Sequence, residues 1–136
     1  HESPEVSAKV RPHVRILIKA FPAGSEALRR ADEHRADVIL IDSSTPGSGE
    51  IFDWSLAEGA PDHRKLLLAG GLHPGNVAAA VEQVNPWGLD VSTGVESSPG
   101  RKDPRLVRTF IQAARSVERP QYTQHGPAPF DWQEES

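Results

Sequence analysis

Two short apolar runs, residues 65–69 and 88–91, are each followed directly by small residues. These are Gly70 and Gly71 after the first run, and Ser92, Thr93 and Gly94 after the second. Glycine lets the backbone approach an anion closely, and unpaired backbone N–H groups can hold that anion without a charged side chain. The two hydroxyl groups could assist. Two such turns on neighbouring strands favour a phosphate site over ordinary tight turns that use glycine for its positive φ.

Two carboxylates stand close to the ends of apolar runs. Asp42 directly follows the apolar residues 38–41, and Asp90 lies two residues before Ser92. Period-two alternation places Asp90 and Ser92 on the same side of a strand. From position alone, Asp42 is either a proton donor or acceptor or a residue that caps the following loop. Asp90 is either a substrate ligand or a buried structural carboxylate.

Other polar residues give weaker signals. The small-residue loop 43–49 is either a lid over a ligand or an ordinary loop, and it lacks the Gly-Lys-Ser/Thr ending of a P-loop. Lys19 either faces an anionic ligand or is a structural cation, which is the commoner role. The histidines have no metal-ligand spacing such as His-x-x-x-His. We therefore expect neither a metal ion nor a cofactor.

The pattern of apolar residues and breakers predicts one helix followed by four strand–helix units. Ser3-Pro4 begins the first helix, which runs to about residue 13, and Ser25 caps a second helix, in which Glu26 and Arg30 have i,i+4 spacing. Strands are expected over 14–20 (ended by Phe21-Pro22), 38–41, 65–69 and 88–91, with further helices over 52–55, 74–84 and 103–116. Continuous apolar runs are typical of parallel strands buried on both faces.

Composition limits the class of protein. The chain has 136 residues, a net charge of −4 and no cysteine. The negative charge disfavours a general nucleic-acid or anionic-membrane partner, and we expect a cytoplasmic protein because no signal peptide or membrane span is evident. The chain does not begin with methionine, so we expect that an upstream part is missing. It is too short for a whole TIM barrel, which needs roughly 200 residues.

Several motifs occur in a characteristic order along residues 1–116. They are Ile39-Leu40-Ile41-Asp42; Gly47-Ser48-Gly49 before Phe52-Asp53-Trp54; Leu68-Ala69-Gly70-Gly71-Leu72-His73-Pro74 with Asn76-Val77; Leu89-Asp90-Val91-Ser92-Thr93-Gly94-Val95-Glu96; and Pro99-Gly100-Arg101-Lys102-Asp103. This set resembles phosphoribosylanthranilate isomerase, the enzyme of tryptophan biosynthesis that performs an Amadori rearrangement. The resemblance covers the C-terminal half of that family's (β/α)8 TIM barrel, from helix 4 to helix 8. It implies an α/β half-barrel over 1–116. Residues 117–136 are rich in proline, glutamine and charge, which indicates a loosely ordered tail.

The resemblance also implies roles for individual residues. Asp42 becomes the general acid, the five small residues at the two turns hold the substrate phosphate, and Asp90 contacts a ribose hydroxyl or the anthranilate nitrogen. The family's general base is a cysteine in a Lys-x-Cys-Gly motif of its N-terminal half, and an arginine of that half helps hold the substrate carboxylate. Neither motif is present here. We therefore expect the missing N-terminal half-barrel as a partner, a small sugar-phosphate substrate, and a monomer or homodimer when complete.

Three hypotheses are compatible with these residues. The first is a phosphoribosylanthranilate isomerase whose isolated fragment is inactive. The second is a non-catalytic phosphate-binding half-barrel, and the third is another sugar-phosphate barrel enzyme such as indole-glycerol-phosphate synthase. The spacing between Asp42 and Phe52-Asp53-Trp54 favours the first hypothesis over the third. Four parallel strands with open edges cannot close a barrel, so the chain alone should be unstable, dimerise or pair with the missing half.

Overall fold

A computed structural model describes residues 2–43, 54–57, 60–61 and 63–117. Within these residues no helix is long and apolar enough to cross a membrane. The predicted loop 43–49 lies almost wholly outside the described residues. Phe52, Asp53 and most of the predicted tail also lie outside them. Val117, the first residue of that tail, packs against the hydrophobic core.

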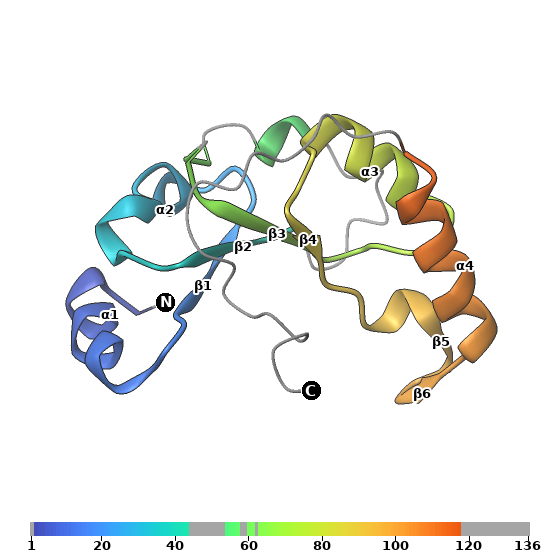
Figure 1. Cartoon of the computed structure of the whole chain (residues 1–136), viewed down its shortest axis with the longest axis horizontal. Helices are drawn as coiled ribbons and strands as arrows, with labels where there is room; N and C mark the ends of the chain where they lie inside the picture. Colours follow the sequence, from blue (N-terminus) through green and yellow to red (C-terminus); the bar gives the residue numbers. More distant parts are fainter. Residues whose placement is uncertain (1, 44–53, 58–59, 62, 118–136) are drawn as a thin grey trace, which may run out of the picture.

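The described residues form helices and strands in an alternating order (Figure 1). The first half contains α1 (Pro4–Val10), the 3-10 helix η1 (Arg11–His13), β1 (Ile18–Pro22), α2 (Glu26–Arg29), η2 (Ala31–His34) and β2 (Val38–Asp42). The second half contains η3 (Trp54–Ala57), β3 (Lys65–Ala69), α3 (Val77–Val84), β4 (Gly88–Leu89), η4 (Thr93–Val95), β5 (Glu96–Ser98), β6 (Arg101–Lys102) and α4 (Pro104–Arg115).

The strand predicted over residues 14–20 is displaced to β1, so this prediction was wrong at both ends. Asp37 accepts a hydrogen bond from the backbone N–H of Leu17 at 2.7 Å and forms an ion pair with Arg11 at 3.1 Å. Side chains thus hold the backbone before β1, and the parallel ladder with β2 begins only at Ile18. Pro22 ends β1 within the ladder rather than breaking it, because an edge strand tolerates the missing N–H.

The second predicted helix is divided into α2 and η2, with Arg30 between them at φ −102°. Ser25 caps α2 as predicted, because its hydroxyl accepts from the N–H of Leu28 at 3.2 Å. The four residues of α2 are too few for the expected pair between Glu26 and Arg30. Glu26 pairs instead with Arg29 at 3.1 Å, and Arg30 pairs with Glu33 at 2.7 Å.

Strands β1, β2, β3 and β4 form a parallel sheet in that order. One face of the sheet is buried, and Figure 1 shows the helices α2, α3 and α4 in an arc outside the strands. Apolar side chains from this face and from the helices make one core, which includes Phe21, Ile39, Ile41, Leu68, Val77, Val81 and Phe110. The parallel strand–helix order is a TIM-barrel-like α/β fold, as predicted.

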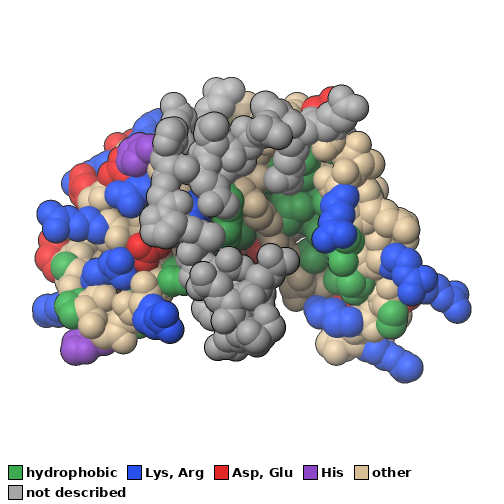
Figure 2. Space-filling model, in the orientation of Figure 1, with side chains coloured by type: hydrophobic (Ala, Val, Ile, Leu, Met, Phe, Trp, Pro, Cys, Tyr) green, Lys and Arg blue, Asp and Glu red, His purple; other side chains and the backbone are tan. Residues whose placement is uncertain are grey.

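The opposite face of the sheet carries apolar side chains that are only partly covered. Alternation along the strands places Ile18, Ala20, Leu40 and Leu67 on this face. Ile18 is 51% exposed, Ala20 is exposed, and the two leucines are half-buried. Figure 2 shows hydrophobic side chains in the middle of the molecule. Parallel sheets are normally covered on both faces, so this face lacks a full second layer among the described residues.

Candidate functional site

The carboxyl ends of the parallel strands bring the two candidate carboxylates to one edge of the sheet. Asp42 is the last residue of β2 and is in register with Pro22 of β1 and Ala69 of β3. Asp90 follows β4, and its N–H donates to the carbonyl of Leu68 at 2.9 Å. Two strand spacings separate Asp42 from Asp90, which corresponds to about 10 Å between their backbones. Both side chains are exposed, so Asp90 is not a buried carboxylate among the described residues.

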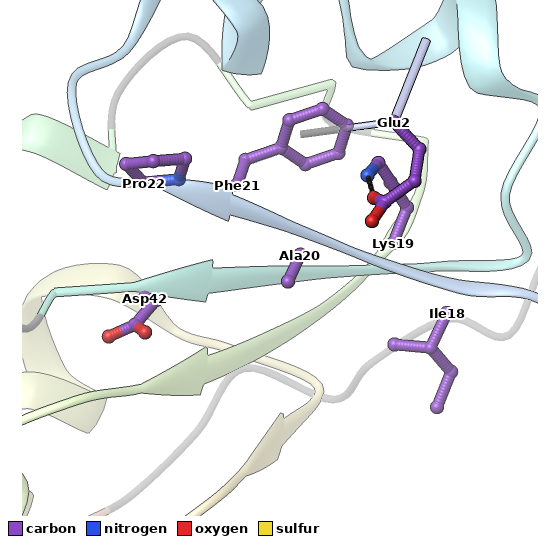
Figure 3. Close-up of a pocket in the computed structure, with 7 residues that line it drawn as sticks. All are labelled: Glu2, Ile18, Lys19, Ala20, Phe21, Pro22 and Asp42. Atoms are coloured by element: carbon purple, nitrogen blue, oxygen red, sulfur yellow. Dashed lines mark hydrogen bonds and ion pairs between the residues drawn. The ribbon is translucent and has the colours of Figure 1, made fainter. Parts of the chain in front are cut away.

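Asp42 lies at the rim of a cavity of about 330 Å³ along β1 (Figure 3). The cavity is lined by Glu2, Ile18, Lys19, Ala20, Phe21, Pro22 and Asp42. In Figure 3, Glu2, Lys19 and Phe21 lie on one side of β1, whereas Ile18 and Asp42 lie on the other. Asp42 is exposed, so the described residues do not enclose it.

Lys19 has a structural role in this arrangement. Its side chain is 11% exposed and forms an ion pair with Glu2, and its ammonium lies 5.9 Å from the centre of the Phe21 ring. The hydrogen bond from Lys19 lowers the pKa of the Glu2 carboxyl to about 2. The ion pair fastens the N-terminal residues onto β1, and it gives the buried ammonium a partner other than a ligand. The structure therefore supports the structural cation and not the anion-facing residue.

The turn after β3 has the backbone shape that requires glycine. Gly70 has φ +83° and Gly71 has φ +63°, a region that L side chains rarely adopt. The Ser43 hydroxyl donates to the carbonyl of Ala69 at 2.8 Å and also bonds the carbonyl of Gly70. The Asn76 amide donates to the carbonyl of Gly71 at 2.9 Å. Side chains on both flanks therefore fix this turn.

Asn76 also fixes the chain that follows the turn. Its side-chain oxygen accepts from the N–H of His73 at 2.9 Å, and the N–H of Gly75 donates to His73 Nδ1 at 3.0 Å. His73 therefore lies at the entry to α3, which begins at Val77 rather than at the predicted residue 74. Asn76 belongs to one of the sequence motifs, but its spacing alone does not predict these hydrogen bonds.

The turn after β4 leaves two backbone donors without a partner in the turn. Ser92 precedes η4, whose hydrogen bonds run from the N–H of Val95 to the carbonyl of Ser92 at 3.4 Å and from Glu96 to the carbonyl of Thr93. In a 3-10 turn of this length the first N–H groups have no acceptor within the helix. The N–H groups of Thr93 and Gly94 are therefore candidates to bind an anion.

Gly94 joins the two turns. A Cβ atom at this position would lie 1.8 Å from the carbonyl oxygen of Leu72 and 3.0 Å from the Cα of His73. The backbone of residues 92–95 therefore packs directly on the segment that follows Gly71. The structure brings the five predicted phosphate residues into two contacting turns, and it shows a packing requirement for glycine at position 94 that the sequence did not reveal.

The hairpin formed by β5 and β6 supplies contacts that the sequence analysis missed. Lys102 donates to the carbonyl oxygen of Ser92 at 3.0 Å and pairs with Glu96 at 2.5 Å. The described residues contain no group of three His, Asp or Glu side chains that could hold a metal ion.

Comparison with known proteins gives a consistent result. The family model described as N-(5'phosphoribosyl)anthranilate (PRA) isomerase matches residues 1–113. The N-(5'-phosphoribosyl)anthranilate isomerase of Desulforudis audaxviator is 46% identical over 123 residues, which are 85% of this chain and 58% of that protein.

Two solved structures from Thermotoga maritima are also similar. The phosphoribosylanthranilate isomerase has a TM-score of 0.71 and 38% identity. The match covers 86% of this chain and 59% of the isomerase chain. The structure of monomers generated from the dimeric enzyme has a TM-score of 0.68 and 36% identity. The match covers 85% of this chain and 57% of that chain. The chain thus spans less than three fifths of the length of each of these relatives.

Proposed function

The chain belongs to the N-(5'phosphoribosyl)anthranilate isomerase family, and we propose that it supplies the general acid and the phosphate site of that enzyme. The observation that carries the proposal is the meeting of Asp42, Asp90 and the two contacting turns at the carboxyl ends of parallel strands. In TIM barrels this end of the strands holds the active site, and phosphate commonly binds after the seventh and eighth strands. Here those strands are β3 and β4.

The open face of the sheet supports a half-barrel that needs another half. Ile18 and Leu67 would complete an apolar barrel interior if four further strands closed on this face. The outer edges of β1 and β4 would then be paired. In this proposal residues 1–116 are the last four β/α units of a (β/α)8 barrel, and residues 117–136 are a separate tail. The complete enzyme is a cytoplasmic monomer or homodimer.

Asp42 begins the reaction as the general acid. It donates a proton to the ribose ring oxygen, the bond from that oxygen to C1 breaks, and the anthranilate nitrogen forms a Schiff base with C1. A base then removes the proton from C2, which leaves an enolamine that tautomerises to the ketone product. This chain has no cysteine, so the base belongs to the missing half. Closure of the barrel would also enclose Asp42.

The two turns hold the substrate phosphate in place during these steps. The N–H groups of Gly71, Thr93 and Gly94 would donate to phosphate oxygens, with the hydroxyls of Ser92 and Thr93 assisting and Gly70 shaping the first turn. Asp90, one residue beyond β4, is placed to contact a ribose hydroxyl or the anthranilate nitrogen. No cofactor is needed, because each step moves only protons and electron pairs within one substrate.

A non-catalytic phosphate-binding half-barrel is the second candidate, and the observation that favours it is that the sequence has no cysteine to act as the base. Both candidates require phosphate binding, so a ligand titration tests what they share. We expect ribose 5-phosphate to shift the amide NMR signals of residues 70–72 and 92–94 in the ¹⁵N-labelled chain, whereas ribose alone should not. If neither set of signals moves, the phosphate site is wrong. Turnover in the presence of the N-terminal half separates the two candidates.

A further inference from the structure

Lys102 connects the β5–β6 hairpin to the turn that precedes η4. Its ammonium lies 3.0 Å from the carbonyl oxygen and 3.3 Å from the hydroxyl of Ser92. The same ammonium pairs with the Glu96 carboxylate at 2.5 Å. An ammonium has three donors, and these three acceptors match them. One side chain therefore contacts both ends of the 92–96 segment.

Glu96 is held as firmly as Lys102. Its side chain is only 11% exposed, and its second oxygen accepts from the N–H of Gly100 at 3.0 Å. Hydrogen bonds from Lys102 and then from Gly100 lower the pKa of Glu96, so the carboxylate is charged at neutral pH. A carboxylate this deeply covered needs its partners, and Lys102 is the cationic one.

The neighbouring basic residue does not share this geometry. Arg101 precedes Lys102 in β6, and successive residues of a strand point to opposite faces. Figure 2 shows Lys and Arg side chains along the right-hand side, over α4 and the hairpin. Of the described basic side chains on α4 and the hairpin, Lys102 alone forms hydrogen bonds to a residue of the candidate phosphate turns, which is Ser92.

We propose that Lys102 is a positioning residue for the phosphate turn, holding Ser92 through its ammonium while Glu96 anchors that ammonium from the other side. This inference rests on the proposed function, because it concerns how the same phosphate site is held in shape. Lys102 fixes the carbonyl of Ser92, and the rigid turn then presents the N–H groups of Thr93 and Gly94 together. Lys102 also balances the charge of Glu96, which would otherwise repel a phosphate bound at this turn.

A set of variants tests this role with inorganic phosphate as the probe and amide NMR shifts of the full 136-residue chain as the readout. Lys102→Met should weaken phosphate binding by about tenfold or more, because a charge-assisted contact is lost and Glu96 is left without its cationic partner. Lys102→Arg should restore part of this loss. Arg101→Met is the matched control, because it removes the same charge from the adjacent residue, and it should bind phosphate like the unchanged chain.

Hydrogen exchange gives a readout that does not depend on the ligand. The amides of Val95 and Glu96, which bond to the carbonyls of Ser92 and Thr93, should exchange faster in Lys102→Met than in Arg101→Met, because the turn has lost its restraint. The double variant Lys102→Met with Glu96→Gln removes both charges of the pair. It replaces Lys102→Met in this test if the single variant does not fold. It should bind phosphate more weakly than the unchanged chain, and its turn amides should also exchange faster.

The outcomes separate this inference from the proposed function. If the unchanged chain shows no phosphate-dependent shift, both are overturned. In a second outcome, the unchanged chain binds phosphate and Lys102→Met, or the double variant in its place, binds phosphate equally well. That result overturns the role of Lys102 and leaves the phosphate site standing. If Arg101→Met loses as much affinity as Lys102→Met, the effect is one of general charge, and the positioning role is also overturned.

Discussion

Replacing Gly94 with alanine tests whether contact between the two turns builds the phosphate site. Gly94 is not among the glycines with positive φ, so its backbone conformation does not itself exclude alanine. The added Cβ would nevertheless meet three backbone atoms, which are the carbonyl oxygen of Leu72 at 1.8 Å, its carbonyl carbon at 2.8 Å and the Cα of His73 at 3.0 Å. Backbone atoms cannot turn away as a flexible side chain can.

The size of the displacement follows from these distances. Real Cβ atoms essentially never approach another atom within 3.0 Å, so relief of the 1.8 Å contact requires the turns to separate by 3.0 − 1.8 = 1.2 Å or more. Misplacement of reacting groups by about 1 Å can lower a reaction rate about 100-fold, and we expect an effect of the same order where several N–H groups must meet one phosphate. We therefore expect Gly94→Ala to weaken binding of ribose 5-phosphate by about that factor, through separated turns rather than through a blocked ligand.

Titration calorimetry with ribose 5-phosphate measures this loss, and circular dichroism shows whether the variant is folded. Gly24→Ala is the matched control, because Gly24 has a positive φ of +68° but lies after β1 and outside both contacting turns. That control should lose about 1–3 kcal/mol of stability from backbone strain but retain affinity. A folded Gly94→Ala chain that binds as well as Gly24→Ala would refute the role of this contact.

Two further predictions concern the buried side of the sheet and its open face. Burial lowers the pKa of His34 below the usual histidine value of 6.5, and the nearby Lys19 charge lowers it further. The stability that neutral His34 contributes is therefore present above pH 6.5 and is lost as the pH falls through the lowered pKa. His34→Gln should reduce the pH dependence of urea unfolding in that window, and an unchanged slope would contradict it. Ile18→Lys should change the stability of the isolated chain by no more than about 0.5 kcal/mol, because the side chain is 51% exposed. The same variant should prevent association with an N-terminal half, measured by sedimentation, and undiminished association would show that this face is not the barrel interior.

Local sequence signals were sufficient where an element is defined by its own residues. The prediction for 65–69 matches β3 at both ends, because an apolar run stops at two glycines whose φ is positive. The first strand was misplaced because its start depends on Asp37, which is 20 residues from the backbone N–H that it binds. The hydrophobic run from residue 14 could not reveal that long-range contact.

The candidate site divides in the same way. Asp42 and the small residues of the two turns could be found because they directly follow apolar runs, and chain order places such residues at one edge of a parallel sheet. The role of Lys102 depends on a hairpin that the sequence analysis missed, in which Lys102 is in register with Glu96. Pro99-Gly100 was an available signal, because Pro-Gly favours a tight turn, and Gly100 indeed has φ +79°.

Turnover of N-(5'-phosphoribosyl)anthranilate, followed by loss of its fluorescence, tests the central claim most directly. The assay compares this chain alone, this chain mixed with a family N-terminal half that carries the cysteine, and the same mixture with Asp42→Asn. We predict turnover only in the second sample, with the Asp42→Asn chain retaining its affinity for ribose 5-phosphate. Turnover by this chain alone would contradict the assignment of the base to another half, and silence of the folded mixture would leave a phosphate-binding half-barrel as the function.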